Sequence, residues 1–236
     1  MINFSERTTD TEIMDDFQGK ASELKIILED ITRVNKILGG NAITVNAVFK
    51  LLKEVPKKSY IIYDVGCADG NMLRTLALKA RKENYSIQFV GVDLNEDALA
   101  LAREASINFP EISYVAKDVL HTDFSSYACD LVLATLTLHH FNNETIINFI
   151  RQFTKVATIG VVINDLQRSP AAYYLFHLFS AIFIRTNIAK IDGLISIRRS
   201  FVKKELQSFA LLFPDIHHQI KWKWAFRYAW IMRKNI

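Results

Sequence analysis

Apolar runs and helical periods alternate along the central part of this chain. Short runs rich in β-branched and aromatic residues predict buried strands, whereas apolar positions three and four residues apart predict helices that cover a sheet. The predicted strands span 60–65, 87–93, 112–116, 129–135 and 158–164, and the predicted helices span 70–82, 95–106 and 142–156. Strands and helices that alternate in this order are typical of a parallel sheet covered on both faces.

Two further helices are predicted before the first strand. Apolar residues recur at helical spacing from Leu24 to Leu38, and Gly39-Gly40 is a typical helix end. Asn41 is expected to cap the second helix, because its side chain accepts from free backbone N–H groups. We therefore divide the chain into a helical extension at 1–58 and an α/β domain at 59–236.

The segment 171–184 is apolar on nearly all sides, too short to span a membrane, and followed by Arg185. One interpretation is a helix wedged between the sheet and its neighbours. The other is a lid whose inner face lines an apolar substrate pocket. A polar link at Asp192-Gly193 and another helix near 203–211 are expected to follow, which gives a helical insertion at about 170–212.

The end of the chain predicts an antiparallel hairpin. Residues 220–224 and 226–232 each alternate between apolar and polar positions, as half-buried strands do. Trp222 and Trp224 could form a base-stacking platform, but aromatic residues at this period are expected to belong to the core.

Composition excludes several classes of protein. Half of the 236 residues are hydrophobic, which is ample for a large core. The two cysteines, Cys67 and Cys129, fit neither a disulfide framework nor a metal cluster, and the N-terminus lacks the pattern of a signal peptide. We therefore expect a cytoplasmic protein with no membrane span.

Positive charge is concentrated at the end of the chain. Residues 168–236 hold 12 lysines and arginines against three acids, although the whole chain has a net charge of only +4. This bias is either an ordinary solvated surface or an attraction to an anionic substrate, carrier or lipid surface, so peripheral membrane contact remains open. No motif supports nucleic-acid binding.

A carboxylate and two glycines end the first predicted strand. Asp64, Gly66 and Gly70 form the pattern D-x-G-x-x-x-G, whereas dinucleotide-binding folds have G-x-G-x-x-G. The glycines permit a positive φ and a close approach of a ligand to the backbone. A carboxylate here repels a pyrophosphate but attracts an ammonium group and a sulfonium. Alone, the motif could still be a loop carboxylate beside a structural turn.

Two more strand ends carry residues suited to the same ligand. Asp93 ends the second strand, where a carboxylate can accept from two ribose hydroxyls. Asp118 and Val119 follow the third strand, and this polar and apolar pair suits an adenine amine and ring face. The order of the acids along the chain is more specific than any one motif.

With these motifs the chain resembles the class I S-adenosylmethionine-dependent methyltransferases over about 59–169. The resemblance implies S-adenosylmethionine as cofactor and S-adenosylhomocysteine as product. It also implies a doubly wound, seven-stranded, mostly parallel α/β sheet closed by the antiparallel hairpin, a Rossmann-like domain with N-terminal helices and a helical lid. The residues that it assigns to the cofactor are Asp64, Gly66, Cys67, Ala68, Gly70, Asp93, Leu94, Asp118, Val119, Thr135 and Leu136.

Catalytic candidates lie at the ends of the fourth and fifth strands. Methyl transfer to oxygen needs alignment and removal of a proton, and His139 and His140 carry imidazoles suited to that task. His-His before a helix also occurs where one ring only packs and hydrogen-bonds to backbone. Asp165 is a second candidate base. With Asn164 and Asp118 it also invites comparison with catechol-type metal sites, but further ligands are missing, so we expect no metal.

The expected function is methylation of a hydrophobic small molecule, either neutral or anionic, at a hydroxyl oxygen. The run Asn164-Asp165-Leu166 followed by Arg168 is similar to small bacterial methyltransferases of secondary metabolism, some of them polyketide-associated. A non-catalytic nucleotide-binding or regulatory protein of this fold is the main alternative, and an NAD-linked enzyme is disfavoured by Asp64. Arg33 or Asn41 could reach the methionine carboxylate. The acceptor and the oligomeric state stay open.

Overall fold

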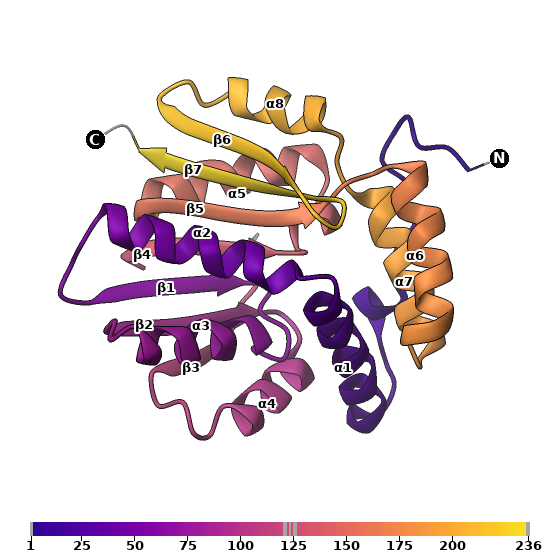
Figure 1. The fold of residues 1–236 in the computed structure, drawn as a ribbon, viewed down its shortest axis with the longest axis horizontal. Helices are drawn as coiled ribbons and strands as arrows, with labels where there is room; N and C mark the ends of the chain where they lie inside the picture. Colours follow the sequence, from indigo (N-terminus) through magenta and orange to yellow (C-terminus); the bar gives the residue numbers. More distant parts are fainter. Residues whose placement is uncertain (1, 120–121, 123, 125–126, 235–236) are drawn as a thin grey trace.

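The computed structural model describes residues 2–119, 122, 124 and 127–234. Its strands are β1 (Tyr60–Val65), β2 (Ile87–Asp93), β3 (Ile112–Ala116), β4 (Cys129–Thr135), β5 (Ala157–Leu166), β6 (Ile216–Lys223) and β7 (Arg227–Lys234). They form one seven-stranded sheet in the order β3-β2-β1-β4-β5-β7-β6 (Figure 1). The first five strands are parallel, and β7 is antiparallel to both β5 and β6. The fold class expected from the sequence is confirmed.

Helices cover both faces of this sheet. The helices are α1 (Ala21–Ile37), α2 (Gly40–Glu54), α3 (Asn71–Lys82), α4 (Glu96–Ala105), α5 (Asn143–Val156), α6 (Pro170–Phe183), α7 (Asn187–Arg199) and α8 (Lys203–Leu211). Helices α2 and α3 contribute to a core on one face, and α5 and α8 contribute to a second core on the other face. Side chains of β4 alternate between the two, with Leu131 and Leu133 in the first core and Val132 and Ala134 in the second.

Three helices and the N-terminal segment lie beyond the carboxyl ends of the parallel strands. Figure 1 shows α1, α6 and α7 at this edge, with the N-terminal segment passing beside them. A short 3-10 helix, η1 (Ile13–Asp16), contacts α7, and a second, η2 (Leu138–His140), follows β4. The N-terminal segment thus meets α7 at the edge where the polar strand ends lie.

Two local predictions about the helices are wrong. Gly39, with φ 69°, is the residue before α2, so Asn41 lies inside the helix rather than capping it. The Asp192-Gly193 pair lies within α7 and is not a link. Glycine fits this helical position because the ring of Phe176 packs against it and leaves no room for a side chain.

The hairpin is where it was predicted, but two of its tryptophans are not in the core. Trp222 is 49% exposed and Trp224 is 66% exposed, because they lie at the turn, where the hairpin ends. Trp230, in the strand next to β5, is fully buried instead. Strand period alone does not distinguish the centre of a hairpin from its tip.

Helix α6 is not wedged between packed neighbours. Its buried residues are only Ala172 and Ser180, while Leu178 and Ile182 are 65% and 77% exposed. The interpretation as an enclosed core helix is therefore wrong. No helix among the described residues is long and apolar enough to cross a membrane.

Basic residues near the end of the chain pair with acidic residues near its beginning. The pairs are Arg185 with Glu29 and Asp30, Arg198 with Asp10, Arg199 with Asp15, and Arg233 with Glu54. Much of the positive charge in the last third is thus neutralised within the chain, which weakens the case for a broad basic docking surface.

Candidate active site

A cavity of about 890 Å³ opens at the carboxyl edge of the sheet. The predicted cofactor residues that line it are Asp64, Gly66, Cys67, Ala68, Asp93, Leu94, Asp118, Val119, Thr135 and Leu136. Gly70 does not line it; this glycine, with φ 71°, is the residue before α3. The strand ends singled out in the sequence therefore converge on one space.

The Asp64 carboxylate is buried without a full set of partners. Its side chain is 2% exposed, and its Oδ1 atom accepts no hydrogen bond from any described residue. Burial, with a smaller contribution from Asp93, raises the pKa of Asp64 to about 8. A buried carboxylate oxygen at a cavity wall is costly unless a donor or cation meets it. The site therefore fits a ligand that brings an ammonium group to β1.

The Asp93 carboxylate is held in place by the backbone. Oδ2 accepts from Ala68 N at 2.8 Å, and Oδ1 accepts from Asn95 N at 3.0 Å. Each carboxylate oxygen has a second lone pair, so acceptor capacity remains. The Asp93 carboxylate is thus fixed at the cavity wall, where its remaining lone pairs can accept hydrogen bonds from two ligand hydroxyls.

Packing also requires glycine at the two turn positions, in addition to ligand access. Gly66 and Gly70 both have φ 71°, where a side chain is strained. A Cβ on Gly66 would collide with Thr137, whose Oγ1 donates to Val65 O at 3.1 Å. A Cβ on Gly70 would collide with the Tyr114 hydroxyl. Neighbouring side chains thus exclude a Cβ at both positions, in addition to the positive φ and the ligand access expected from the sequence.

The start of α2 is tied to the strand ends. Asn164 Nδ2 donates to Gly40 O at 2.9 Å and to Thr44 Oγ1 at 3.0 Å. Thr44 and Thr135 share a hydrogen bond of 3.0 Å between their hydroxyls. Asn164 therefore holds α2 on the sheet.

Two residues suggested for the methionine carboxylate differ in position. Asn41 lines the cavity, and its Nδ2 donates to Asn71 Oδ1 at 3.0 Å at the start of α3. Arg33 is exposed and is not among the residues that line the cavity. Of the two, only Asn41 stays a candidate for contacting the methionine carboxylate.

Asp165 and His139 form a buried pair, of which only His139 lines the cavity. His139 Nδ1 lies 2.7 Å from Asp165 Oδ1, and both side chains are 2% exposed. The other Asp165 oxygen accepts from His139 N at 3.2 Å, and Leu166 N donates to Oδ1 at 2.7 Å. Asp165 does not line the cavity, so it orients His139 rather than reaching a ligand.

A second carboxylate faces the far side of the His139 ring. Glu12 Oε1 lies 3.4 Å from His139 Nε2 and accepts from Ser196 Oγ at 2.8 Å. Burial lowers the pKa of His139, but Asp165 and Glu12 outweigh it and raise the value to about 9. His139 is therefore an imidazolium at neutral pH, with a carboxylate beside each ring nitrogen.

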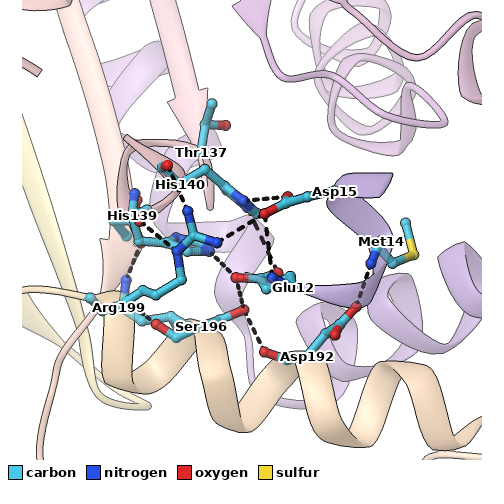
Figure 2. Close-up of polar contacts among 12 residues, drawn as sticks. Glu12, Met14, Asp15, Thr137, His139, His140, Asp192, Ser196 and Arg199 are labelled. Atoms are coloured by element: carbon cyan, nitrogen blue, oxygen red, sulfur yellow. Dashed lines mark hydrogen bonds and ion pairs between the residues drawn. The ribbon is translucent and has the colours of Figure 1, made fainter. Parts of the chain in front are cut away.

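His140 lies between the same N-terminal segment and the cavity. Its Nδ1 lies 2.9 Å from Asp15 Oδ1, and its side chain is 28% exposed. Arg199 Nη1 binds the other Asp15 oxygen at 2.9 Å, and burial, outweighed by His140 and Arg199, leaves the pKa of Asp15 at about 2. Figure 2 shows Glu12 and Asp15 reaching the two histidines from η1 and its flank.

Glu12 and Asp15 are the site residues that sequence reasoning missed. They lie more than a hundred positions from His139, in a polar segment with no motif. No local pattern could have placed them, because their position depends on how η1 packs against α7.

The arrangement bears on the metal question. Glu12, His139 and His140 bring ligand atoms within 4.8 Å of one another. The protonated His139 ring already offsets one of the two negative charges of Asp165 and Glu12, which both contact it. Asn164 and Asp165 are neighbours in β5 and therefore point to opposite faces, so they do not form a joint metal site. The absence of a metal remains a prediction.

One end of the cavity is apolar. Leu28 and Ile31 of α1 face it, together with Phe176 and Phe179 of α6 and Ile184 beyond that helix. The inner face of α6 thus contributes aromatic rings to the wall, while its outer face is exposed. The cavity combines a polar rim at the strand ends with a pocket suited to an apolar molecule.

Comparison with known proteins agrees with this geometry. Residues 62–160 match the family model of a methyltransferase domain. No curated protein is similar by sequence. Among solved structures, the plantazolicin methyltransferase BpumL in complex with SAH is 13% identical, with a TM-score of 0.67 over 91% of this chain and 98% of that chain.

Two other solved structures are similar in fold. The magnesium protoporphyrin IX methyltransferase from Synechocystis PCC 6803, with bound SAH, is 14% identical, with a TM-score of 0.58 over 86% of this chain and 87% of that one. A SAM-dependent methyltransferase from Aquifex aeolicus is 14% identical, with a TM-score of 0.59 over 92% of this chain and all of that one. Residues 62–160 therefore match a methyltransferase domain, and the chain has the fold of these solved methyltransferases.

Proposed function

We propose that this chain transfers a methyl group from S-adenosylmethionine to a hydroxyl oxygen of a hydrophobic small molecule. The observation that carries the proposal is the Asp64 carboxylate, which is buried at the cavity wall with an oxygen that no described residue satisfies. A ligand with an ammonium group and a nearby sulfonium supplies the missing positive charge.

The residues around Asp64 are proposed to hold the remaining parts of the cofactor. Asp93 binds the ribose hydroxyls, and Asp118 and Val119 flank the adenine. Cys67, Ala68, Leu94, Thr135 and Leu136 complete the wall, and all of them line the cavity. Support also comes from the similar solved structures that were determined with SAH.

The acceptor is proposed to occupy the apolar end beneath α6. This helix acts as a lid whose inner rings exclude water from the reacting atoms. When bound, S-adenosylmethionine supplies an electrophilic methyl group, and the protein has to align the acceptor oxygen with it and take up the proton that the hydroxyl loses.

His140 is the proposed general base. His139 already carries a proton between Asp165 and Glu12, so it cannot accept another. His140 is partly exposed to the cavity, and Asp15 contacts its Nδ1 at 2.9 Å, whereas Nε2 lies 3.9 Å from Glu12 Oε2; Nε2 is therefore the less tightly held nitrogen and is proposed to receive the proton. Asp165 and His139 are positioning residues, because their hydrogen bonds fix η2 and the ring that follows.

Replacing Asp93 with alanine is expected to abolish cofactor binding, because it removes the ribose acceptor and the partner of Ala68 N. Calorimetry with S-adenosylmethionine, S-adenosylhomocysteine and NAD measures this effect. Asp97→Ala, which removes an exposed carboxylate on α4, is the matched control and should bind normally. Binding of NAD alone by the unmodified protein would refute the proposed function.

Replacing His140 with alanine is expected to lower turnover by about 100-fold or more while leaving the affinity for S-adenosylhomocysteine unchanged. Turnover is measured as transfer of a labelled methyl group to hydroxylated small molecules, starting with any that co-purify with the chain. His177→Ala, on the exposed side of α6, is the control. Equal turnover in both variants would remove His140 as the base. Cofactor binding with no transfer to any acceptor would favour the regulatory alternative.

A further inference from the structure

The guanidinium of Arg227 is buried at the cavity wall with few partners. Arg227 is 2% exposed and lies at the start of β7, opposite Leu166 of β5. Nη2 donates to Asn35 Oδ1 at 2.6 Å, whereas Nε and Nη1 donate to no described residue. Burial lowers the pKa of Arg227 to about 10, which leaves the group charged at neutral pH. An uncompensated buried cation costs several kcal/mol, roughly, until an anion meets it.

The residues around the Arg227 guanidinium accommodate it without neutralising its charge. Gly40 lies against the guanidinium, and a Cβ at that position would come within 2.8 Å of Arg227 Cζ. The carboxylate that influences Arg227 most is Asp165, and it is engaged by His139 and by Leu166 N. Among the described residues no further side chain pairs with the guanidinium, so a neutralising anion would have to enter from the cavity, which Arg227 lines.

We propose that Arg227 binds a carboxylate group of the methyl acceptor, so that the substrate is an apolar molecule with an anionic end. Charge-assisted hydrogen bonds from a guanidinium to a carboxylate are strong and directional. The apolar wall of Leu28, Phe176 and Phe179 would hold the body of the same molecule. This assignment rests on the proposed function, because it takes the molecule that binds Arg227 to be the methyl acceptor.

The position of Arg227 favours the acceptor over the methionine carboxylate of the cofactor. In the sheet order, β4 and β5 separate β1 from β7, so the strands that carry Asp64 and Arg227 lie about 14 Å apart at the usual strand spacing. The ammonium and carboxylate of an amino acid share one carbon atom. A ligand whose ammonium contacts Asp64 therefore has its carboxylate near β1, where the candidate partner is Asn41 of α2, whose Nδ2 donates to Asn71 at the start of α3.

The test compares a carboxylate with its uncharged amide. Calorimetry measures the binding of 2-naphthoate and 2-naphthamide to the full chain saturated with S-adenosylhomocysteine. We expect the carboxylate to bind about tenfold or more tightly than the amide, as hydrogen bonds to a charged group predict. In Arg227→Met this preference should vanish, while the affinity for S-adenosylhomocysteine stays within about twofold of the unmodified protein.

Arg233→Met is the matched control, because Arg233 lies on the same strand but pairs with Glu54 away from the cavity. It should keep the preference for the carboxylate. Arg227→Gln serves if the methionine variant unfolds, and thermal unfolding of each variant shows which is usable.

Three results would overturn the assignment: equal binding of acid and amide to the unmodified protein, a preference that survives in Arg227→Met, or a loss of S-adenosylhomocysteine affinity of about tenfold or more in that variant. The last result would place Arg227 in the cofactor site. Failure of the unmodified protein to bind S-adenosylhomocysteine would instead refute the proposed function. The carboxylate preference can then still be measured on the ligand-free chain.

Discussion

Asp64→Asn should abolish cofactor binding and at the same time stabilise the ligand-free protein. The cofactor loses the carboxylate proposed to pair with its ammonium group, and removal of one partner from a buried charge pair costs about 2–5 kcal/mol of binding. The ligand-free protein gains because the carboxylate is buried and lacks a partner for Oδ1. Calorimetry and thermal unfolding measure the two effects on the same sample.

The sign of the stability effect follows from the pKa. Burial raises the pKa of Asp64 from an ordinary 3.8 to about 8, so the folded protein holds this proton more tightly than the unfolded chain does. The contribution of Asp64 to the free energy of unfolding therefore falls as the pH rises from the pKa of the unfolded chain towards the pKa of the folded protein. We expect the asparagine variant to have the higher Tm at pH 8 and no advantage at pH 4. Asp97→Asn, an exposed carboxylate, should change neither property. A variant less stable than the unmodified protein at pH 8 would contradict the account.

Arg168→Leu should cause a large loss of stability. The guanidinium is buried and binds Glu205 Oε1 at 2.7 Å, Phe4 O at 3.0 Å and Ser5 O at 3.2 Å, as well as Ser200 O. Leucine would leave these acceptors without their donor, and breaking a buried ion pair costs about 3–5 kcal/mol. Urea unfolding measures the change.

Arg151→Leu is the control for this experiment, since Arg151 is exposed on α5 and contacts only Asn148 among the described residues. Its cost should be within about 0.5 kcal/mol of zero. If both variants lose the same stability, Arg168 does not join the N-terminal segment to the rest of the fold in the way described.

The central sheet was predictable because its signals are local. Each strand from β1 to β5 is a short apolar run followed by a turn or a helical period, and the parallel order follows from their alternation. Asp64 and Asp93 could be assigned to one cavity for a related reason. Parallel strands end at a common edge, so residues far apart in sequence become neighbours without any knowledge of packing.

The part of the cavity proposed for the acceptor could not be predicted from local patterns in the same way. Glu12 contacts His139 and Ser196 only because η1 packs on α7, and Arg227 reaches the cavity only because β7 pairs with the end of β5. Gly193 was misplaced because it is glycine for a packing reason, the close approach of the Phe176 ring, which composition does not reveal. Local patterns give elements and strand ends, whereas these positions depend on tertiary contacts.

The division of the cavity between chain segments bears on how such enzymes diverge. The proposed cofactor contacts fall within residues 62–160, whereas Glu12, Asp15, Arg199 and Arg227 lie outside that segment. The N-terminal segment and α7 are joined beside the cavity through pairs such as Arg199 with Asp15. If the acceptor binds at the proposed place, exchange of acceptor preference between relatives would require the N-terminal segment and the region from α6 to β7 to be transplanted as a unit. A chimera that takes only one of them would separate groups that have to fold against each other.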